Sequence, residues 1–223
     1  MEKMKKKVSE MSEWEEYISE IELIEKQNNV EYDLYCVIAP LLKRREDLKE
    51  YSIRDISHRR RTKEGRERLF WGIKGFPDFV IMDKNYDQKE TYDKSVIYGV
   101  IEAKYVNKPI DDSEDKLQLK GHLLSFGTVI YTNGYIWKIY KNTKNNKAGI
   151  KTQENKSYAT KAEDKKTWEE IDNWLNKKVK SLDKYSLGTF VLKKDEESSW
   201  NKTEWDRLIK ALNKFFSNDI DNI

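Results

Sequence analysis

Two stretches near the start of the chain have apolar residues every three or four positions, which predicts two amphipathic helices. In the first, residues 12–26, Ser12 and Glu15 have the spacing of a capping box that begins a helix. The second runs from Val30 to Leu42. Pro40 is expected to kink this helix or end it early, because proline lacks an amide hydrogen and its ring clashes with the preceding turn.

The pattern changes in the centre of the chain, where β-branched and aromatic residues become frequent. Phe76–Met82 and Val96–Val106 have this composition, which favours strands. The polar stretch Asp83–Lys94 between them is typical of a loop, so we expect the two strands to pair as an antiparallel hairpin. A short strand is also predicted around Tyr51–Ile56. Residues 115–126 then return to helical spacing.

A second hairpin is predicted directly after this helix. Asn133 and Gly134 separate two apolar strands, Thr128–Thr132 and Tyr135–Tyr140, and both residue types accept the positive φ that tight hairpin turns require. Residues 141–164 are rich in Lys and Asn without periodicity and are predicted to be a loop.

Two amphipathic helices are expected in the last third of the chain, around residues 168–182 and 205–215. The range 185–192 between them fits either a strand or an extended link. We therefore expect a core with its N-terminal helices over residues 1–141, and a loop with C-terminal helices packed on that core over residues 142–223. The apolar face that carries Trp168 and Trp174 fits the core better than an interface.

The composition excludes several classes of protein. The longest clean apolar run, Cys36–Leu42, is far shorter than the ~18 residues of a membrane span. The basic start of the chain has no apolar segment after it, so no signal peptide is expected. One cysteine and two histidines argue against an internal disulfide and against a zinc site. The cytoplasm is the expected compartment, with no membrane partner.

The charges are unevenly distributed although the net charge is only +3. Eight of the nine arginines lie between Arg44 and Arg68. Arginine makes planar, two-pronged contacts to phosphate, so this stretch is either a patch that faces phosphates or a solvated loop balanced by its own acidic residues. Both interpretations remain open from the sequence.

Three charged residues in the central strands form the main candidate site. Asp78 begins one predicted strand, and Glu102 and Lys104 lie in the next, where alternation of side chains makes both point the same way. Two carboxylates suit Mg²⁺ or Mn²⁺, and an ammonium group stabilises charge on a phosphate or helps to deprotonate a bound water. Alternatively, Glu102 and Lys104 form a surface ion pair, although charges in an otherwise apolar strand are costly.

These residues belong to a longer series of motifs. The sequence contains, in this order, Gly75–Asp78, Val100–Lys104, Gln118 and Val129–Gly134 with Trp137. This order of motifs resembles that of the PD-(D/E)xK nuclease superfamily. The likeness is greatest to the nuclease domain at the N-terminus of type I restriction motor subunits. It covers roughly residues 29–141. The motor helicase of those enzymes has no counterpart here, and residues 142–223 match no motif.

The resemblance implies a restriction-endonuclease-like α/β fold, with a mixed β-sheet flanked by helices, to which the apolar pattern of the last third adds a helical C-terminal extension. It implies Mg²⁺- or Mn²⁺-dependent cleavage of phosphodiester bonds. The metal ligands it implies are Asp78, Glu102 and the Ala103 carbonyl, with Glu31 as a further candidate on the second helix. Glu31 equally fits a helix N-cap pair with Asn28.

The resemblance also assigns roles to a lysine and a glutamine. Lys104 would orient or activate the attacking water, and Gln118 would act beside it from the following helix. A polar helix face turned to solvent is the alternative for Gln118, and more so for His122 one turn later. His58 and its neighbours Arg59, Arg60 and Arg61 are candidates for phosphate contacts.

The sequence thus predicts a metal-dependent endonuclease with DNA as the expected substrate, and RNA remains open. Restriction, defence against phages or mobile elements, repair and counter-defence are all compatible roles, and so is a homodimer. A non-cleaving nucleic-acid-binding module on the same fold is one alternative. A protein-interaction adaptor built on the C-terminal helices is another.

Overall fold

The computed structural model describes residues 11–45, 51–57, 69–87, 97–109, 112–142, 165–194 and 199–216. Its centre is one six-stranded mixed sheet in which the strands follow one another in chain order. The strands are β1 (Tyr51–Asp55), β2 (Phe79–Asp83), β3 (Ile97–Ala103), β4 (Thr128–Thr132), β5 (Ile136–Lys141) and β6 (Ser186–Val191). The predicted class, a mixed α/β protein with helices flanking the sheet, is confirmed.

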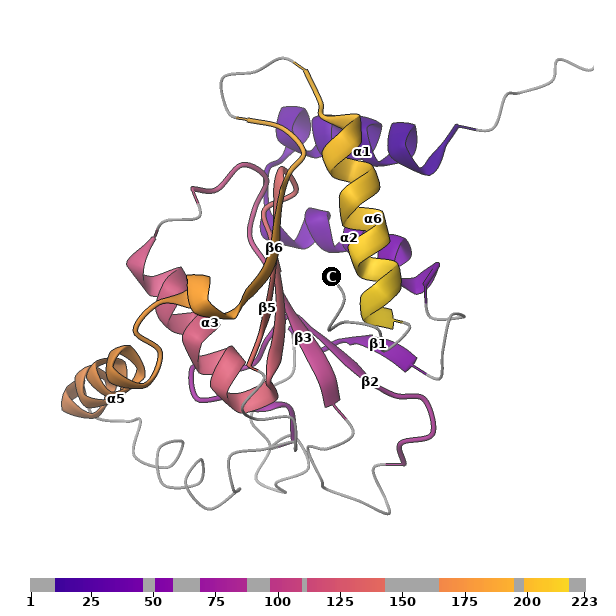
Figure 1. Cartoon of the computed structure of the whole chain (residues 1–223). Coiled ribbons are helices and arrows are strands. Elements are labelled where there is room, and N and C mark those ends of the chain that lie inside the picture. The colour runs from indigo at the N-terminus through magenta and orange to yellow at the C-terminus, as the bar shows by residue number, and fades with distance from the viewer. Residues whose placement is uncertain are drawn as a thin grey trace, which may run out of the picture.

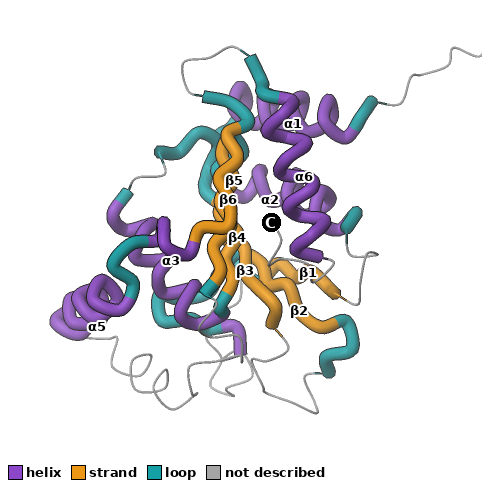
Figure 2. The backbone as a smooth tube through the Cα atoms, in the orientation of Figure 1, coloured by secondary structure: helices purple, strands orange, loops and turns teal. Residues whose placement is uncertain are grey.

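The helices form a layer on each face of the sheet (Figure 1). One layer consists of α1 (Glu13–Gln27), α2 (Glu31–Lys43) and α6 (Lys202–Phe216). The other consists of α3 (Ser113–Phe126) and α5 (Lys165–Lys178), followed by a short 3₁₀ helix, η5 (Leu182–Tyr185). Figure 2 shows the strands running between these two layers. In the ranges that the structure describes, no helix is both long and apolar enough to cross a membrane.

Helix α3 connects the only parallel pair of the sheet. Strands β3 and β4 run parallel, with Glu102 paired to Tyr131, and every other neighbouring pair is antiparallel. Parallel strands need a crossover connection, which is usually a helix. The crossover places α3 against β3 and β4, so that one flank of α3 lies beside the end of β3.

Both N-terminal helices are present, with one difference from expectation. The capping box at α1 is confirmed: Glu15 donates its amide to Ser12 Oγ at 3.3 Å, and Ser12 donates its amide to Glu15 Oε2 at 2.8 Å. The prediction that Pro40 ends α2 early is wrong, because the helix continues to Lys43. The carbonyl that loses its partner is that of Cys36, an exposed position, where water can replace the missing amide.

The two predicted hairpins pair as expected. Strand β2 is antiparallel to β3, although it begins at Phe79 rather than Phe76. Strands β4 and β5 enclose Asn133 and Gly134, but only Gly134 has a positive φ, of 80°. The side chain of Asn133 stabilises the turn instead, because its Oδ1 accepts the amides of Tyr135 at 3.1 Å and Ile136 at 2.8 Å.

The last third of the chain contributes to the sheet as well as to the helical layers. The range 185–192 is a strand, β6, which pairs with β5 at the sheet edge. Of the two alternatives for this range, the strand is confirmed, and the helical C-terminal extension therefore also contains one strand. Phe190 of β6 and Leu192 directly after this strand belong to the buried core cluster. Trp168 and Trp174 of α5 pack against the buried cluster beneath α3, as expected.

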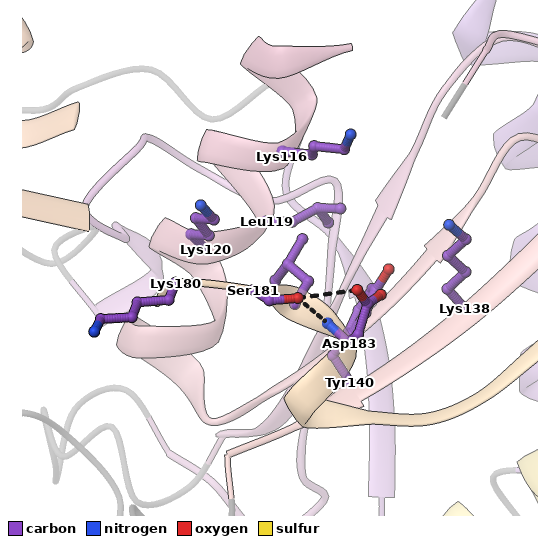
Figure 3. Close-up of a pocket in the computed structure, with 9 residues that line it drawn as sticks. Lys116, Leu119, Lys120, Lys138, Tyr140, Lys180, Ser181 and Asp183 are labelled. Atoms are coloured by element: carbon purple, nitrogen blue, oxygen red, sulfur yellow. Dashed lines mark hydrogen bonds between the residues drawn. The ribbon is translucent and has the colours of Figure 1, made fainter. Parts of the chain in front are cut away.

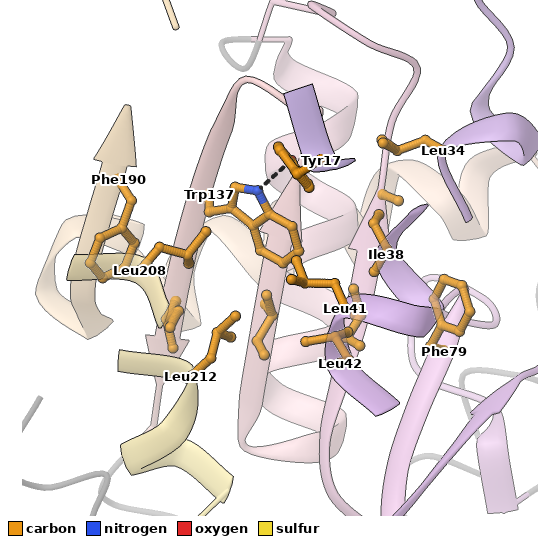
Figure 4. Close-up of a cluster of buried hydrophobic side chains, with 14 of the residues drawn as sticks. Tyr17, Leu34, Ile38, Leu41, Leu42, Phe79, Trp137, Phe190, Leu208 and Leu212 are labelled. Carbon is orange, nitrogen blue, oxygen red and sulfur yellow. Dashed lines mark hydrogen bonds between the residues drawn. The ribbon is translucent and has the colours of Figure 1, made fainter. Parts of the chain in front are cut away.

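The apolar core lies in two layers, one on each face of the sheet. In the layer beneath α1, α2 and α6, the fully buried Trp137 is the largest side chain (Figure 4). Its Nε1 donates to the hydroxyl of Tyr17 at 3.0 Å, and Tyr17 donates to the carbonyl of Gly134 at 2.6 Å. These bonds satisfy the polar atoms of two buried aromatic side chains and tie α1 to the β4–β5 turn.

Candidate functional site

The candidate site lies at the end of β3, where both helical layers meet the sheet. Asp78 directly precedes β2, and its Oδ2 accepts the amide of Ala103 at 2.7 Å. Glu102 is the next-to-last residue of β3, and Lys104 follows this strand. Asp78 is 8% exposed and Glu102 is 1% exposed. The structure therefore brings together the three residues that the sequence singled out.

Lys104 is at the centre of this group. Its Nζ lies 2.7 Å from Glu102 Oε1 and 3.1 Å from Gln118 Oε1. Glu31 and Asp115 are further away, at 4.0 and 3.8 Å. Burial alone would lower the pKa of Lys104, but the charge and hydrogen bond of Glu102, followed by the other acids, raise it. Lys104 is consequently an ammonium group at neutral pH.

Gln118 is placed where the resemblance implies. It lies on the flank of α3 that faces Lys104, and not on a face turned wholly to solvent. The amide oxygen accepts from the ammonium group, so Gln118 helps to fix the direction of the Lys104 side chain.

Glu31 reaches the site through Tyr35. The Tyr35 hydroxyl lies 2.9 Å from Glu31 Oε1 and in hydrogen-bonding contact with Asp78 Oδ1. One phenolic hydrogen cannot serve two carboxylates at once. A second hydrogen is therefore needed on one of the two carboxyl groups. Burial, followed by repulsion from Glu102, raises the pKa of Asp78 to about 8, so Asp78 is the carboxyl group that is protonated near neutral pH.

His122 approaches Glu102 from the other helical layer. Its Nε2 lies 3.2 Å from Glu102 Oε2, and the ring is fully buried. The alternative that this residue faces solvent does not hold, because α3 packs this flank against β3 and β4. Burial alone would raise the pKa of Glu102, but the His122 hydrogen bond and the charge of Lys104 outweigh it and lower this pKa. Glu102 is therefore the ionised member of the Asp78–Glu102 pair.

The site carries more acidic than basic groups. Its carboxyl groups belong to Glu31, Asp78, Glu102, Asp112 and Asp115, and its ammonium groups to Lys104 and Lys108. Among the described residues the acidic groups are thus in excess, which favours binding of a divalent cation, and carboxylate oxygens are the ligands that Mg²⁺ and Mn²⁺ prefer. The type of ligand atom and the net charge of these residues both fit Mg²⁺ or Mn²⁺.

The side chains are nevertheless not arranged around a common point. Within the described ranges, no three Asp, Glu, His or Cys side chains are grouped closely enough to hold a metal ion. Asp78 is turned to Tyr35 and the Ala103 amide, and Glu102 to Lys104 and His122. Binding a cation would require the carboxyl groups of Asp78 and Glu102 to exchange some of these partners.

Sequence reasoning missed several residues of this site, including Tyr35, Lys108, Asp115 and, as a site member, His122. Tyr35 lies one turn after Glu31, and Asp115 and His122 flank Gln118 at one-turn spacing on α3, so helical periodicity was the available signal. Lys108 had no signal, because its partner Asp115 is reached across a loop.

The predicted phosphate-contacting residues His58, Arg59, Arg60 and Arg61 lie outside the described residues. The beginning of the arginine-rich stretch is described, and it makes internal contacts. Arg44 pairs with Glu16 at 2.8 Å, and Arg45 pairs with Glu13 at 3.0 Å. These two arginines thus bind α2 to α1.

Comparisons of the chain with protein-family models, curated proteins and solved structures give no match. The geometry of the site is therefore the basis for an assignment of function.

Proposed function

We propose that this protein is a metal-dependent endonuclease that hydrolyses phosphodiester bonds, with DNA as its substrate and a restriction-endonuclease-like arrangement of the PD-(D/E)xK type. The observation that supports this proposal is the convergence of Asp78, Glu102 and Lys104 at one end of the sheet. Buried charges destabilise a fold unless they are paired or used. Asp78 and Glu102 are both buried, and the carboxyl groups around them outnumber the ammonium groups, which is costly for the fold and therefore indicates a function.

The roles of the individual residues combine the resemblance in sequence with the contacts at the site. Asp78 and Glu102, with the Ala103 carbonyl and Glu31, would hold Mg²⁺ or Mn²⁺, which supplies Lewis-acid stabilisation of negative charge on the phosphate. Lys104 remains protonated, so it donates hydrogen bonds to a phosphate oxygen or to the attacking water and does not act as a base.

The surrounding residues position these groups. Gln118 and Glu102 hold the ammonium group of Lys104 in place, at 3.1 and 2.7 Å. Tyr35 connects Glu31 to Asp78, and His122 holds the second oxygen of Glu102. Compatible biological roles are restriction, defence against phages or mobile elements, and repair.

The test is a cleavage assay with supercoiled plasmid, linear duplex, single-stranded DNA and RNA, each with Mg²⁺, Mn²⁺ or EDTA. Cleavage should require the cation and should be lost in Asp78→Asn, Glu102→Gln and Lys104→Ala. Asp206→Asn and Lys43→Ala are matched controls, because they change similar groups at exposed positions on α6 and at the C-terminal end of α2, and neither residue belongs to the site. The controls should cleave as the wild-type protein does.

Two outcomes would contradict the proposal. Equal activity in the three site variants would place the nuclease site elsewhere. A wild-type protein that binds nucleic acid and cuts none of these substrates with either metal would instead be the non-cleaving binding module.

A further inference from the structure

A second charged site lies on the flank of α3 opposite Gln118. A cavity of about 290 Å³ opens there between α3, β5 and the segment that follows α5 (Figure 3). Four of its lining residues are lysines from three elements of the fold, and one is acidic. The charged and polar lining residues are Lys116, Lys120, Lys138, Lys180, Ser181 and Asp183.

The lysines are not neutralised by the acidic residue among them. Asp183 Oδ2 accepts from the hydroxyl of Ser181 at 2.9 Å, and it makes no ion pair with any residue that the structure describes. Lys120 donates to the uncharged side chain of Asn176 at 2.7 Å. Lys120, Lys138 and Lys180 outnumber Asp183 by two, so the described lining keeps an excess of positive charge.

This arrangement is electrostatically unfavourable without an anion. Lys116 and Lys120 are four residues apart on α3, a spacing at which like charges destabilise a helix. Burial, followed by the charge of Lys116, lowers the pKa of Lys120. Lys138 projects from β5 on the face that α3 covers, since it pairs with the buried Tyr131 in the sheet. A phosphate group would relieve the repulsion between these side chains.

We propose that this lysine-lined cavity binds backbone phosphate of the nucleic-acid strand that the candidate site cleaves. The inference rests on the proposed function and extends it to the path of the substrate. Lys116 and Gln118 are two residues apart on α3, so they lie on opposite flanks of one helix, about 10–12 Å apart across its width. Each strand of a duplex carries one phosphate per about 3.4 Å of helix axis, so this width spans about three phosphates measured along that axis.

The size of the cavity favours one phosphate group of a nucleic-acid strand over a complete small-molecule ligand. Its volume lies at the lower limit of the roughly 300–1,000 Å³ typical of small-molecule sites, which accommodates a phosphate and part of its sugar. Stacking of a base would need an aromatic side chain with an open face. Among the described lining residues Tyr140 is the one aromatic residue, and it is only 4% exposed.

The test compares two double variants in a binding assay with EDTA, so that cleavage plays no part. Lys138→Gln with Lys180→Gln removes two charges from the cavity, and Lys43→Gln with Lys210→Gln removes two from exposed positions of the other helical layer. The probe is a fluorescein-labelled single-stranded DNA oligonucleotide, titrated over a series of salt concentrations. Unfolding curves of all three proteins verify that each is folded.

The cavity variant should bind more weakly and with less dependence on salt. Loss of two phosphate contacts should reduce the slope of log affinity against log salt by about 1.4, which corresponds to about 25-fold weaker binding at 0.1 M salt. The control variant should retain the wild-type slope. Equal losses in both variants, or no loss in the cavity variant, would overturn the inference.

Two further measurements separate the possible sources of phosphate and the two proposals. Inorganic phosphate and a mononucleotide are titrated by calorimetry. If the cavity variant loses only these ligands and binds the oligonucleotide normally, the cavity is a site for free phosphate and the inference is wrong. If the wild-type protein binds DNA through the cavity but never cuts it with Mn²⁺, the inference stands and the proposed nuclease activity fails.

Discussion

Replacing Asp78 by asparagine removes a buried carboxyl group while keeping groups that can bond to both of its partners. The amide oxygen can accept from the Ala103 amide, and the amide nitrogen can donate to the hydroxyl of Tyr35, which then donates to Glu31. The substitution therefore isolates the effect of the charge from the loss of hydrogen bonds. We expect the variant to be more stable than the wild-type protein when no divalent cation is present.

The magnitude follows from the pKa of Asp78, which is raised from 3.8 to about 8 in the folded protein. Between these values the folded state holds a proton that the unfolded state has lost, so stability falls as the pH rises. The loss is about 1.4 kcal/mol per pH unit, or about 4 kcal/mol at pH 7. This value is an upper limit, because the side chains can turn and relieve part of the repulsion.

The assay is urea unfolding in EDTA at several pH values between 4 and 8. The two proteins should have similar free energies of unfolding near pH 4, and the difference should widen with each pH unit in favour of Asp78→Asn. At pH 7 the full effect corresponds to a rise of roughly 10 °C in Tm for a chain of this size. Added Mg²⁺ should narrow the difference, because it stabilises the ionised wild-type carboxylate.

Asp206→Asn is the matched control, since this aspartate is exposed on α6 and its substitution should give no pH-dependent difference. A difference between wild type and Asp78→Asn that stays constant from pH 4 to pH 8 would refute the reasoning. So would an asparagine variant that is less stable at pH 8. Either result would mean that Asp78 is ionised in the folded protein without a cation.

Three other expectations are open to direct test. Lys104→Ala should reduce cleavage by about 100- to 1,000-fold while Mn²⁺ binding by calorimetry survives, since only a charge beside the phosphate is lost; normal cleavage would show that the lysine has no such role. Tyr17→Phe should lower the free energy of unfolding by about 1–3 kcal/mol, because Trp137 Nε1 and the Gly134 carbonyl lose their buried partner; an unchanged urea midpoint would contradict this. Alanine at Arg59–Arg61 should weaken DNA binding and reduce its salt slope if this stretch contacts phosphates, whereas unchanged binding isotherms would make it a solvated loop.

The parts of the structure that could be predicted are those in which local pattern and fold agree. The capping residue of α1 and the turn at Asn133 are encoded by neighbours in the chain, and the structure has both. Strand alternation was enough to bring Glu102 and Lys104 together, since both lie in or directly after one strand.

Other features depend on contacts between distant segments, which one sequence does not reveal. Tyr35 touches Asp78 across 43 residues, and His122 touches Glu102 across 20 residues, each from a different helical layer. Strand β6 was ambiguous because its register depends on β5, from which it is separated along the chain by a long segment that includes α5. Pro40 was misjudged because an exposed helix face tolerates a missing hydrogen bond that a buried one does not.

The aromatic contacts between α1 and the end of the described chain have a consequence for synthesis on the ribosome. Trp14 lies 5.3 Å from Trp205 between ring centres, and Trp200 donates to Glu22 across 178 residues. At about 5–20 residues per second, the interval between synthesis of these partners is roughly 10–40 s. During that time the apolar face of α1 lacks its partner helix. This nascent segment is thus expected to bind chaperones, and slow translation should increase its aggregation.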